Sequence, residues 1–83
     1  MLYPQAINVT PLSGYKLLVA FDNGENRVFD VNPYLRGDWF SELRDANVFN
    51  AVTVSGYSVA WPDGQDIAPD CLYVNSVRVN GPE

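Results

Sequence analysis

The chain contains no histidine and only one cysteine, Cys71, and both shortages restrict its chemistry. Histidine is the side chain that proteins use most often as a general base, and it activates many serine and cysteine nucleophiles. A single cysteine cannot form a disulfide within the chain, which fits a reducing compartment. We therefore expect no serine or cysteine hydrolase, although another kind of enzyme stays open. Cys71 itself is expected to be an inert, small apolar side chain.

Clustered positive charge is also missing. Ten acidic residues oppose five basic ones, for a net charge of −5, and the basic residues occur singly along the chain. Proteins that bind nucleic acid neutralise its phosphates with several neighbouring cations, so we expect no nucleic-acid partner. The six glycines are scattered rather than gathered in a phosphate-binding loop, and we expect no cofactor.

Long apolar runs are absent as well. No stretch approaches the ~20 apolar residues that cross a bilayer, and the first residues lack the features of a signal peptide. We expect a cytoplasmic protein that does not bind membranes. At 83 residues, positions 1–83 are expected to form a single domain whose thin core leaves no room for a deep pocket.

The first half of the sequence predicts a three-stranded meander. Residues 5 to 10 alternate apolar and polar side chains up to Pro11, which we expect to end the strand, and strands at 15 to 21 and 26 to 31 follow. The loop at Asp22, Asn23 and Gly24 has two possible registers. A three-residue loop with a glycine bulge is favoured because it pairs Leu17 with Phe29 and Lys16 with Asp30, whereas a two-residue turn would place Asp22 opposite Glu25.

A helical connector is expected next, with Asn32 capping one turn that ends at Gly37, and Asp38 capping a helix of about 39 to 46. Residues 50 to 61 predict a hairpin whose two-residue turn is Ser55-Gly56, which pairs Val54 with Tyr57. A short helix beginning at Pro69 follows, and residues 75 to 79 are left either as an edge strand or as loose chain. The sequence thus predicts a small α+β domain with an antiparallel sheet, in the order meander, helical connector, hairpin and short C-terminal helix.

The most distinctive segment is the elbow at residues 61 to 70. In its Trp-Pro-Asp-Gly start, Pro62 and Asp63 suit the central positions of a type I turn, and Gly64 supplies the positive φ that leaves it. Its carboxylates Asp63, Asp66 and Asp70 form the only acidic cluster. They do not match the calcium-loop pattern, so turn and cap roles are favoured over a metal or small-ligand site.

Trp39 and Trp61 are the candidate anchors for a partner, because tryptophan, tyrosine and arginine dominate binding energies at protein interfaces. Of the two, Trp39 is expected to be the more exposed, since it lies off the helix face defined by Phe40 and Leu43. The candidate interaction or ligand surface therefore comprises Trp39, Trp61, Asp63, Asp66 and Asp70, with no catalytic residue among them.

Two segments, the Phe-Asp-Asn-Gly-Glu hairpin at 21 to 25 and the Trp-Pro-Asp-Gly-Gln-Asp elbow at 61 to 66, resemble a small bacterial family, domain-of-unknown-function family 2442. The resemblance extends over roughly residues 5 to 74, with Ala68 in place of the serine expected before Pro69. It implies a small α+β domain without established enzyme activity, and a toxin–antitoxin-like arrangement with another small protein. No catalytic residue can be transferred from it.

Together these observations favour a non-catalytic protein-interaction module, of which an antitoxin-like protein is one form. A carboxylate-based metal-binding or small-ligand protein or enzyme at Asp63, Asp66 and Asp70 is the alternative. The expected partner is a small protein, or a second copy joined through the strand edge from Ser76 to Asn80.

Overall fold

The computed structural model describes residues 3–35 and 41–79 of the chain. The elements in chain order are β1 (Ala6–Leu12), β2 (Lys16–Phe21), β3 (Asn26–Asp30), η1 (Asn32–Tyr34), η2 (Glu42–Arg44), α2 (Ala46–Phe49), β4 (Thr53–Ser55), β5 (Ser58–Ala60), β6 (Asp66–Ile67), α3 (Pro69–Val74) and β7 (Val77–Val79). The strands form two antiparallel sheets, with the orders β1-β2-β3-β7 and β4-β5-β6. The predicted α+β class is confirmed.

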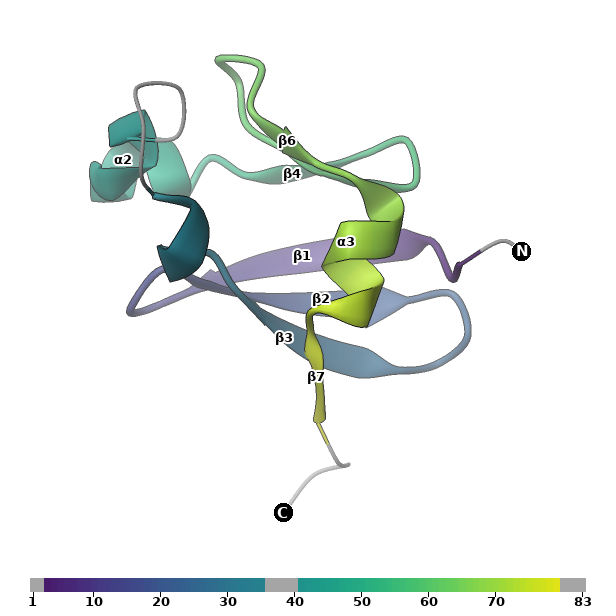
Figure 1. Ribbon diagram of the computed structural model, residues 1–83. Coiled ribbons are helices and arrows are strands. Elements are labelled where there is room, and N and C mark those ends of the chain that lie inside the picture. Colours follow the sequence, from purple (N-terminus) through teal and green to yellow (C-terminus); the bar gives the residue numbers. More distant parts are fainter. Residues whose placement is uncertain (1–2, 36–40, 80–83) are drawn as a thin grey trace.

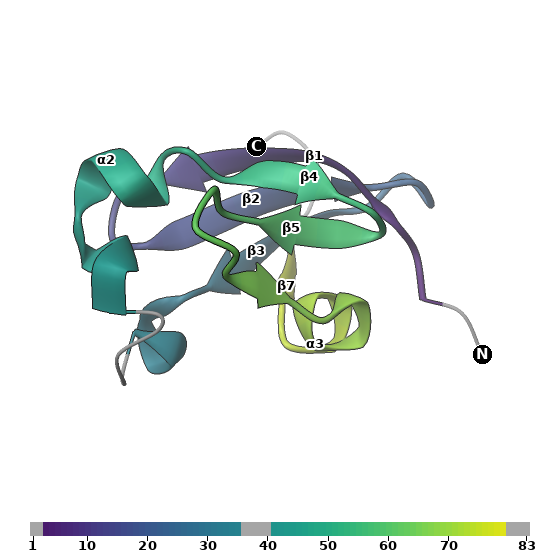
Figure 2. The same cartoon turned by 90° about the horizontal axis from the view of Figure 1, so that it is seen from above.

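The two sheets lie one above the other, and α3 closes one side of the space between them (Figure 1, Figure 2). Apolar side chains from both sheets and from α3 fill this space: Leu17, Val19, Phe21, Phe29, Val59, Trp61, Ile67 and Leu72. All of them are at most 5% exposed. Because burying one such side chain stabilises the fold by roughly 1.5–3 kcal/mol, this layer is the main source of stability.

The β2–β3 hairpin has the predicted bulged loop. Leu17 pairs with Phe29 and Lys16 with Asp30, as expected from the avoidance of like charges. Gly24 has a φ of +89° and donates its N–H to the Phe21 carbonyl, which closes the turn. The elbow repeats this geometry, because Gly64 (φ +103°) donates to the Trp61 carbonyl in the same way. The elbow therefore contains the loop of a β5–β6 hairpin with the same turn geometry, and the sequence analysis missed β6, the second strand of this hairpin.

The β4–β5 register was predicted wrongly. Val54 pairs with Val59 rather than with Tyr57, and Ser55 pairs with Ser58. The central turn residues are Gly56 and Tyr57, with Gly56 at a φ of +59°. A glycine at the first central position is what a type II′ turn requires, and this preference decides the register. The shift of two residues keeps each side chain on its predicted face.

β1 does not end at Pro11, as was expected. The strand continues to Leu12, with Pro11 opposite Leu17, because β1 is an edge strand of its sheet and the missing N–H of proline lies on the unpaired side. A bulge lies between Ala6 and Asn8, and the Ala6 N–H donates to the Tyr57 carbonyl of the other sheet.

Tyr15, in the β1–β2 turn, has a φ of +62°, the only positive value among the non-glycine residues that are described. Such a conformation is strained for a bulky side chain. The Tyr15 hydroxyl donates to the Arg44 carbonyl, and its ring packs edge-on against Phe49 at 5.3 Å between centroids. These contacts hold the β1–β2 turn against η2 and α2.

The helical connector differs from its prediction in two places. Asn32 is the first residue of η1 rather than its cap; its own N–H and side chain both donate to the Asp30 carboxylate. The continuous helix expected at 39 to 46 is broken at Asp45, whose ψ of 120° is extended and whose carboxylate caps α2 by accepting from the Asn47 N–H. Gly37 and Asp38 lie outside the described residues.

Candidate interaction surface

The three elbow carboxylates are exposed and do not form a cluster. Asp63 lies in the turn, Asp66 in β6, and Asp70 in the first turn of α3, where it accepts the N–H of Cys71. Within residues 3–35 and 41–79, no group of three or more histidine, cysteine, aspartate or glutamate side chains is placed to hold a metal ion. The geometry gives the carboxylate alternative no support as a metal site.

Of the two tryptophans predicted to anchor a partner, Trp61 is buried. Trp61 is only 3% exposed, and its indole N–H donates to the Phe49 carbonyl at 2.9 Å. It is therefore a core residue that joins β5 to α2 and cannot anchor a partner. Trp39 lies outside the described residues.

A more extensive candidate surface lies on the face of the larger sheet that points away from the core. Strand alternation and register place Thr10, Leu18, Val28 and Val77 in one row across all four strands; we call this the outer row. Among the described elements, none packs beneath this face in Figure 1. The strand β7 forms one edge of this sheet: it pairs with β3 on one side and, within the described part of the chain, with no strand on the other. We call that other side the β7 edge.

Exposed valines gather next to the β7 edge. Val77 is 71% exposed, Val79 42% and Val74, at the end of α3, 59%. Between the two strand valines, Arg78 points to the opposite face of the sheet, where it lies across from Arg27. Its guanidinium makes no hydrogen bond or ion pair with the described residues, and it is exposed. Among the described residues, the β7 edge therefore combines unpaired backbone, apolar side chains on one face and, on the other, the positive charge of Arg78, which helps to lower the pKa of Glu25 without forming an ion pair.

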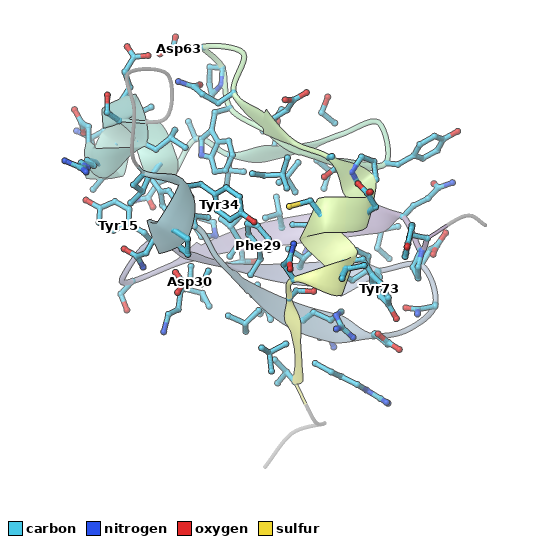
Figure 3. The ribbon with its side chains drawn as sticks, in the orientation of Figure 1. Tyr15, Phe29, Asp30, Tyr34, Asp63 and Tyr73 are labelled. Carbon is cyan, nitrogen blue, oxygen red and sulfur yellow. The ribbon has the colours of Figure 1, made fainter. Side chains whose placement is uncertain are left out.

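Arg27 holds β7 and α3 in place. Its Nε donates to Ser76 Oγ at 2.7 Å, one Nη donates to the Ser76 carbonyl at 2.8 Å, and the other contacts Glu25 Oε1 at 2.9 Å. The guanidinium also lies 4.4 Å from the ring centroid of Tyr73, close enough for a cation–π contact. Figure 3 shows Tyr73 on α3, on the side of the helix that faces the larger sheet.

The same network lowers the pKa of a carboxyl group, that of Glu25. The hydrogen bond from the Tyr73 hydroxyl, followed by contacts with Arg27, holds the pKa of Glu25 below its usual value. The sequence analysis missed this network, because Arg27 and Ser76 are 49 residues apart. The only available signal was a basic residue within a strand otherwise expected to face the core.

Cys71 is half-buried on α3. Its Sγ lies 3.2 Å from the Tyr34 hydroxyl and 3.4 Å from Asn75 Nδ2. The contact with Cys71, followed by burial, raises the pKa of Tyr34. Figure 3 shows Tyr34 beside Phe29, in line with their stacked rings at 5.4 Å. Within the described part of the chain, neither of these contacts of the thiol is with a cationic side chain.

Two stacked antiparallel sheets and a short closing helix define a small α+β domain. Residues 6–78 match a family described as protein of unknown function (DUF2442), and the chain belongs to this family. Neither a curated protein nor a solved structure matches the chain. Among the described residues, no helix is long and apolar enough to span a membrane.

Proposed function

We propose that the protein is a non-catalytic protein-interaction module that binds an extended segment of a partner protein along the β7 edge. The observation that carries this proposal is Arg78, an exposed basic side chain in the middle of an edge strand, which makes no hydrogen bond or ion pair with the described residues. Edge strands of this kind accept an added strand, whose main-chain hydrogen bonds supply affinity while alternate side chains supply specificity.

The chemistry of the edge indicates the partner. A carboxylate opposite Arg78 would extend the row of Arg27 and Arg78 with the opposite charge, and apolar side chains opposite Val77 and Val79 would cover the two exposed valines. The proposed partner segment therefore alternates acidic and apolar residues. Recognition of this kind is by charge as well as by shape, which favours specificity.

Self-association through the same edge is disfavoured in its most symmetric form. An antiparallel pair of β7 strands centred on Arg78 would place this arginine opposite its own copy, with Arg27 next in the row of each. Like charges directly opposite one another destabilise a strand pair. A different protein is therefore the favoured occupant.

An antitoxin-like role would be one instance of this function, since an antitoxin of this kind acts by binding its toxin. The single cysteine fits action in the reducing cytoplasm. Of the exposed carboxylates of the elbow, Asp63 is assigned to the turn and Asp70 to the first turn of α3, where it accepts the Cys71 N–H.

Site-specific photo-crosslinking tests the proposal. A benzophenone amino acid replaces Val77 in the cells that make the protein, and the same residue at Thr53, which is exposed on β4, is the matched control. We expect a discrete crosslink at position 77 to an acidic segment of another protein, absent at position 53 and lost when Arg78→Glu is added. Arg44→Glu, the same charge change at an exposed site of η2, should leave it intact.

The outcomes separate the alternatives. A crosslink from position 77 to a second copy, together with dimer mass in light scattering, would replace the partner by self-association. Equal crosslinking at both positions, or a crosslink insensitive to Arg78→Glu, would overturn the proposal.

A further inference from the structure

The smaller sheet carries a separate feature on its outer side. A hollow of about 360 Å³ lies between the β4–β5 hairpin, β6 and the start of α3. Its polar lining comes from Ser55, Ser58 and Asp66, and its apolar lining includes Tyr57, Ile67 and Pro69. Hollows of this size are at the lower end of those that bind small molecules or single side chains.

Ser58 gives the hollow an unusual property. It is only 4% exposed, and its hydroxyl has no hydrogen-bonding partner among the described residues. A buried hydroxyl without a partner costs roughly 1–3 kcal/mol, so such groups are rare in folded proteins. A rotation about χ1 to another staggered position is the movement that would turn the hydroxyl toward a bound group. A ligand in the hollow would supply the missing partner.

The lining selects the charge of that ligand. The carboxylate of Asp66 only accepts hydrogen bonds, and the two serine hydroxyls also accept them. Among the described residues that line the hollow there is no lysine or arginine. An anion would face Asp66 without a compensating charge. A primary ammonium has three donors for these three acceptors, and the ring of Tyr57, 60% exposed, is available for a cation–π contact.

We propose that this hollow binds a primary ammonium on a short apolar stem, the chemistry shared by a lysine side chain and a small aliphatic amine. Asp66 supplies the charge, Ser55 and Ser58 accept the remaining N–H groups, and the apolar wall holds the stem. The site is independent of the β7 edge.

The test is a binding titration followed by NMR with three probes that share a butyl stem: n-butylamine, n-butanol and pentanoate. We expect the amine alone to shift the amides of β5 and β6. Asp66→Asn should weaken amine binding by roughly tenfold or more, because it removes a charge-assisted hydrogen bond. Asp63→Asn is the matched control, since Asp63 is an exposed carboxylate of the same elbow that does not line the hollow.

Ser58→Ala separates binding from structure. Removing a hydroxyl that has no partner in the free protein should leave the urea midpoint unchanged or higher, while amine binding weakens severalfold. A lysine amide with a blocked N-terminus is the second probe; tighter binding of this compound than of butylamine would identify a protein lysine as the source.

Equal binding of butanol and butylamine would overturn the proposal, as would an equal effect of Asp63→Asn and Asp66→Asn. A lower urea midpoint for Ser58→Ala with unchanged amine binding would also overturn it, since the hydroxyl would then serve the fold alone.

Discussion

The loss of stability on replacing Arg27 can be worked out from the contacts that this side chain makes. Arg27→Ala removes two hydrogen bonds to Ser76, the ion pair with Glu25 and the cation–π contact with Tyr73. Hydrogen bonds from charged groups contribute about 1.5–3 kcal/mol when buried, and an exposed cation–π contact about 0.5–1 kcal/mol. Because the site is only partly buried and its contacts share one side chain, they do not add in full. We expect a loss of about 2–3 kcal/mol.

Urea unfolding followed by tryptophan fluorescence measures the loss. With a slope of roughly 1–1.5 kcal/mol per molar for a domain of this size, the midpoint should fall by about 1.5–2 M. Amide hydrogen exchange shows where the loss occurs. The β7 amides should lose more protection than those of β2, because β7 pairs with β3 over only three residues and Arg27 holds the adjacent Ser76. Arg27→Lys should recover only part of the loss, because lysine cannot repeat the forked geometry.

Arg44→Ala is the matched control, since this arginine is exposed on η2, and it should change stability by no more than about 0.5 kcal/mol. If Arg27→Ala and Arg44→Ala unfold at the same urea concentration and exchange β7 amides at the same rate, the network does not hold β7, and the reasoning fails.

Three further predictions follow from single sites. Gly64→Ala should lower the free energy of unfolding, measured in urea, by about 1 kcal/mol or more. Nothing lies within 4 Å of the added Cβ, so the cost comes from the φ of +103° alone. An unchanged urea midpoint, together with Mg²⁺ or Ca²⁺ binding by the wild type that Asp66→Asn abolishes, would instead support a metal site at the elbow. The Tyr73 hydroxyl is the main cause of the lowered pKa of Glu25, so the ionised carboxylate stabilises the fold at pH values above 4.5, and this stabilisation is lost as the pH falls through the folded-state pKa. The difference in unfolding free energy between wild type and Tyr73→Phe should therefore become smaller from pH 7 to pH 3. A constant difference would contradict this. Cys71 should react with a thiol reagent at least about tenfold more slowly in the native protein than in urea, and equal rates would reopen a redox role.

The parts of the fold that could be predicted depended on local signals with one favoured outcome. The β2–β3 register follows from the sequence because the competing loop opposes Asp22 to Glu25. The β4–β5 register does not, because both candidate turns contain Gly56, and only the backbone shows which central position it takes. A strand of two residues, such as β6, is too short to leave a periodic pattern.

The candidate surface was harder to predict than the fold. Tryptophan is a residue type that often anchors interfaces, yet the indole N–H of Trp61 donates to the carbonyl of Phe49 in the core. The two residues are 12 positions apart, so the sequence did not indicate this contact. The sequence analysis did single out residues 76 to 80 as a strand edge, and β7 lies at Val77–Val79. What it could not supply was the contrast between Arg27, whose guanidinium bonds Ser76 and Glu25, and Arg78, which makes no hydrogen bond or ion pair with the described residues.

The two edges of the larger sheet differ in a way that limits how far assembly can proceed. On β1, Pro11 lacks a donor, the bulge before Asn8 interrupts the regular spacing, and the Ala6 N–H is already bonded to Tyr57. A strand can therefore join at β7 but finds a poor template at β1. Joining β7 of one molecule to β1 of the next would be needed for a growing filament, because such head-to-tail contacts do not close. Under the proposed function, the unequal edges would let the domain accept one strand at β7 without extending its sheet from β1, so the exposed edge would be kept for binding without the aggregation that usually accompanies it.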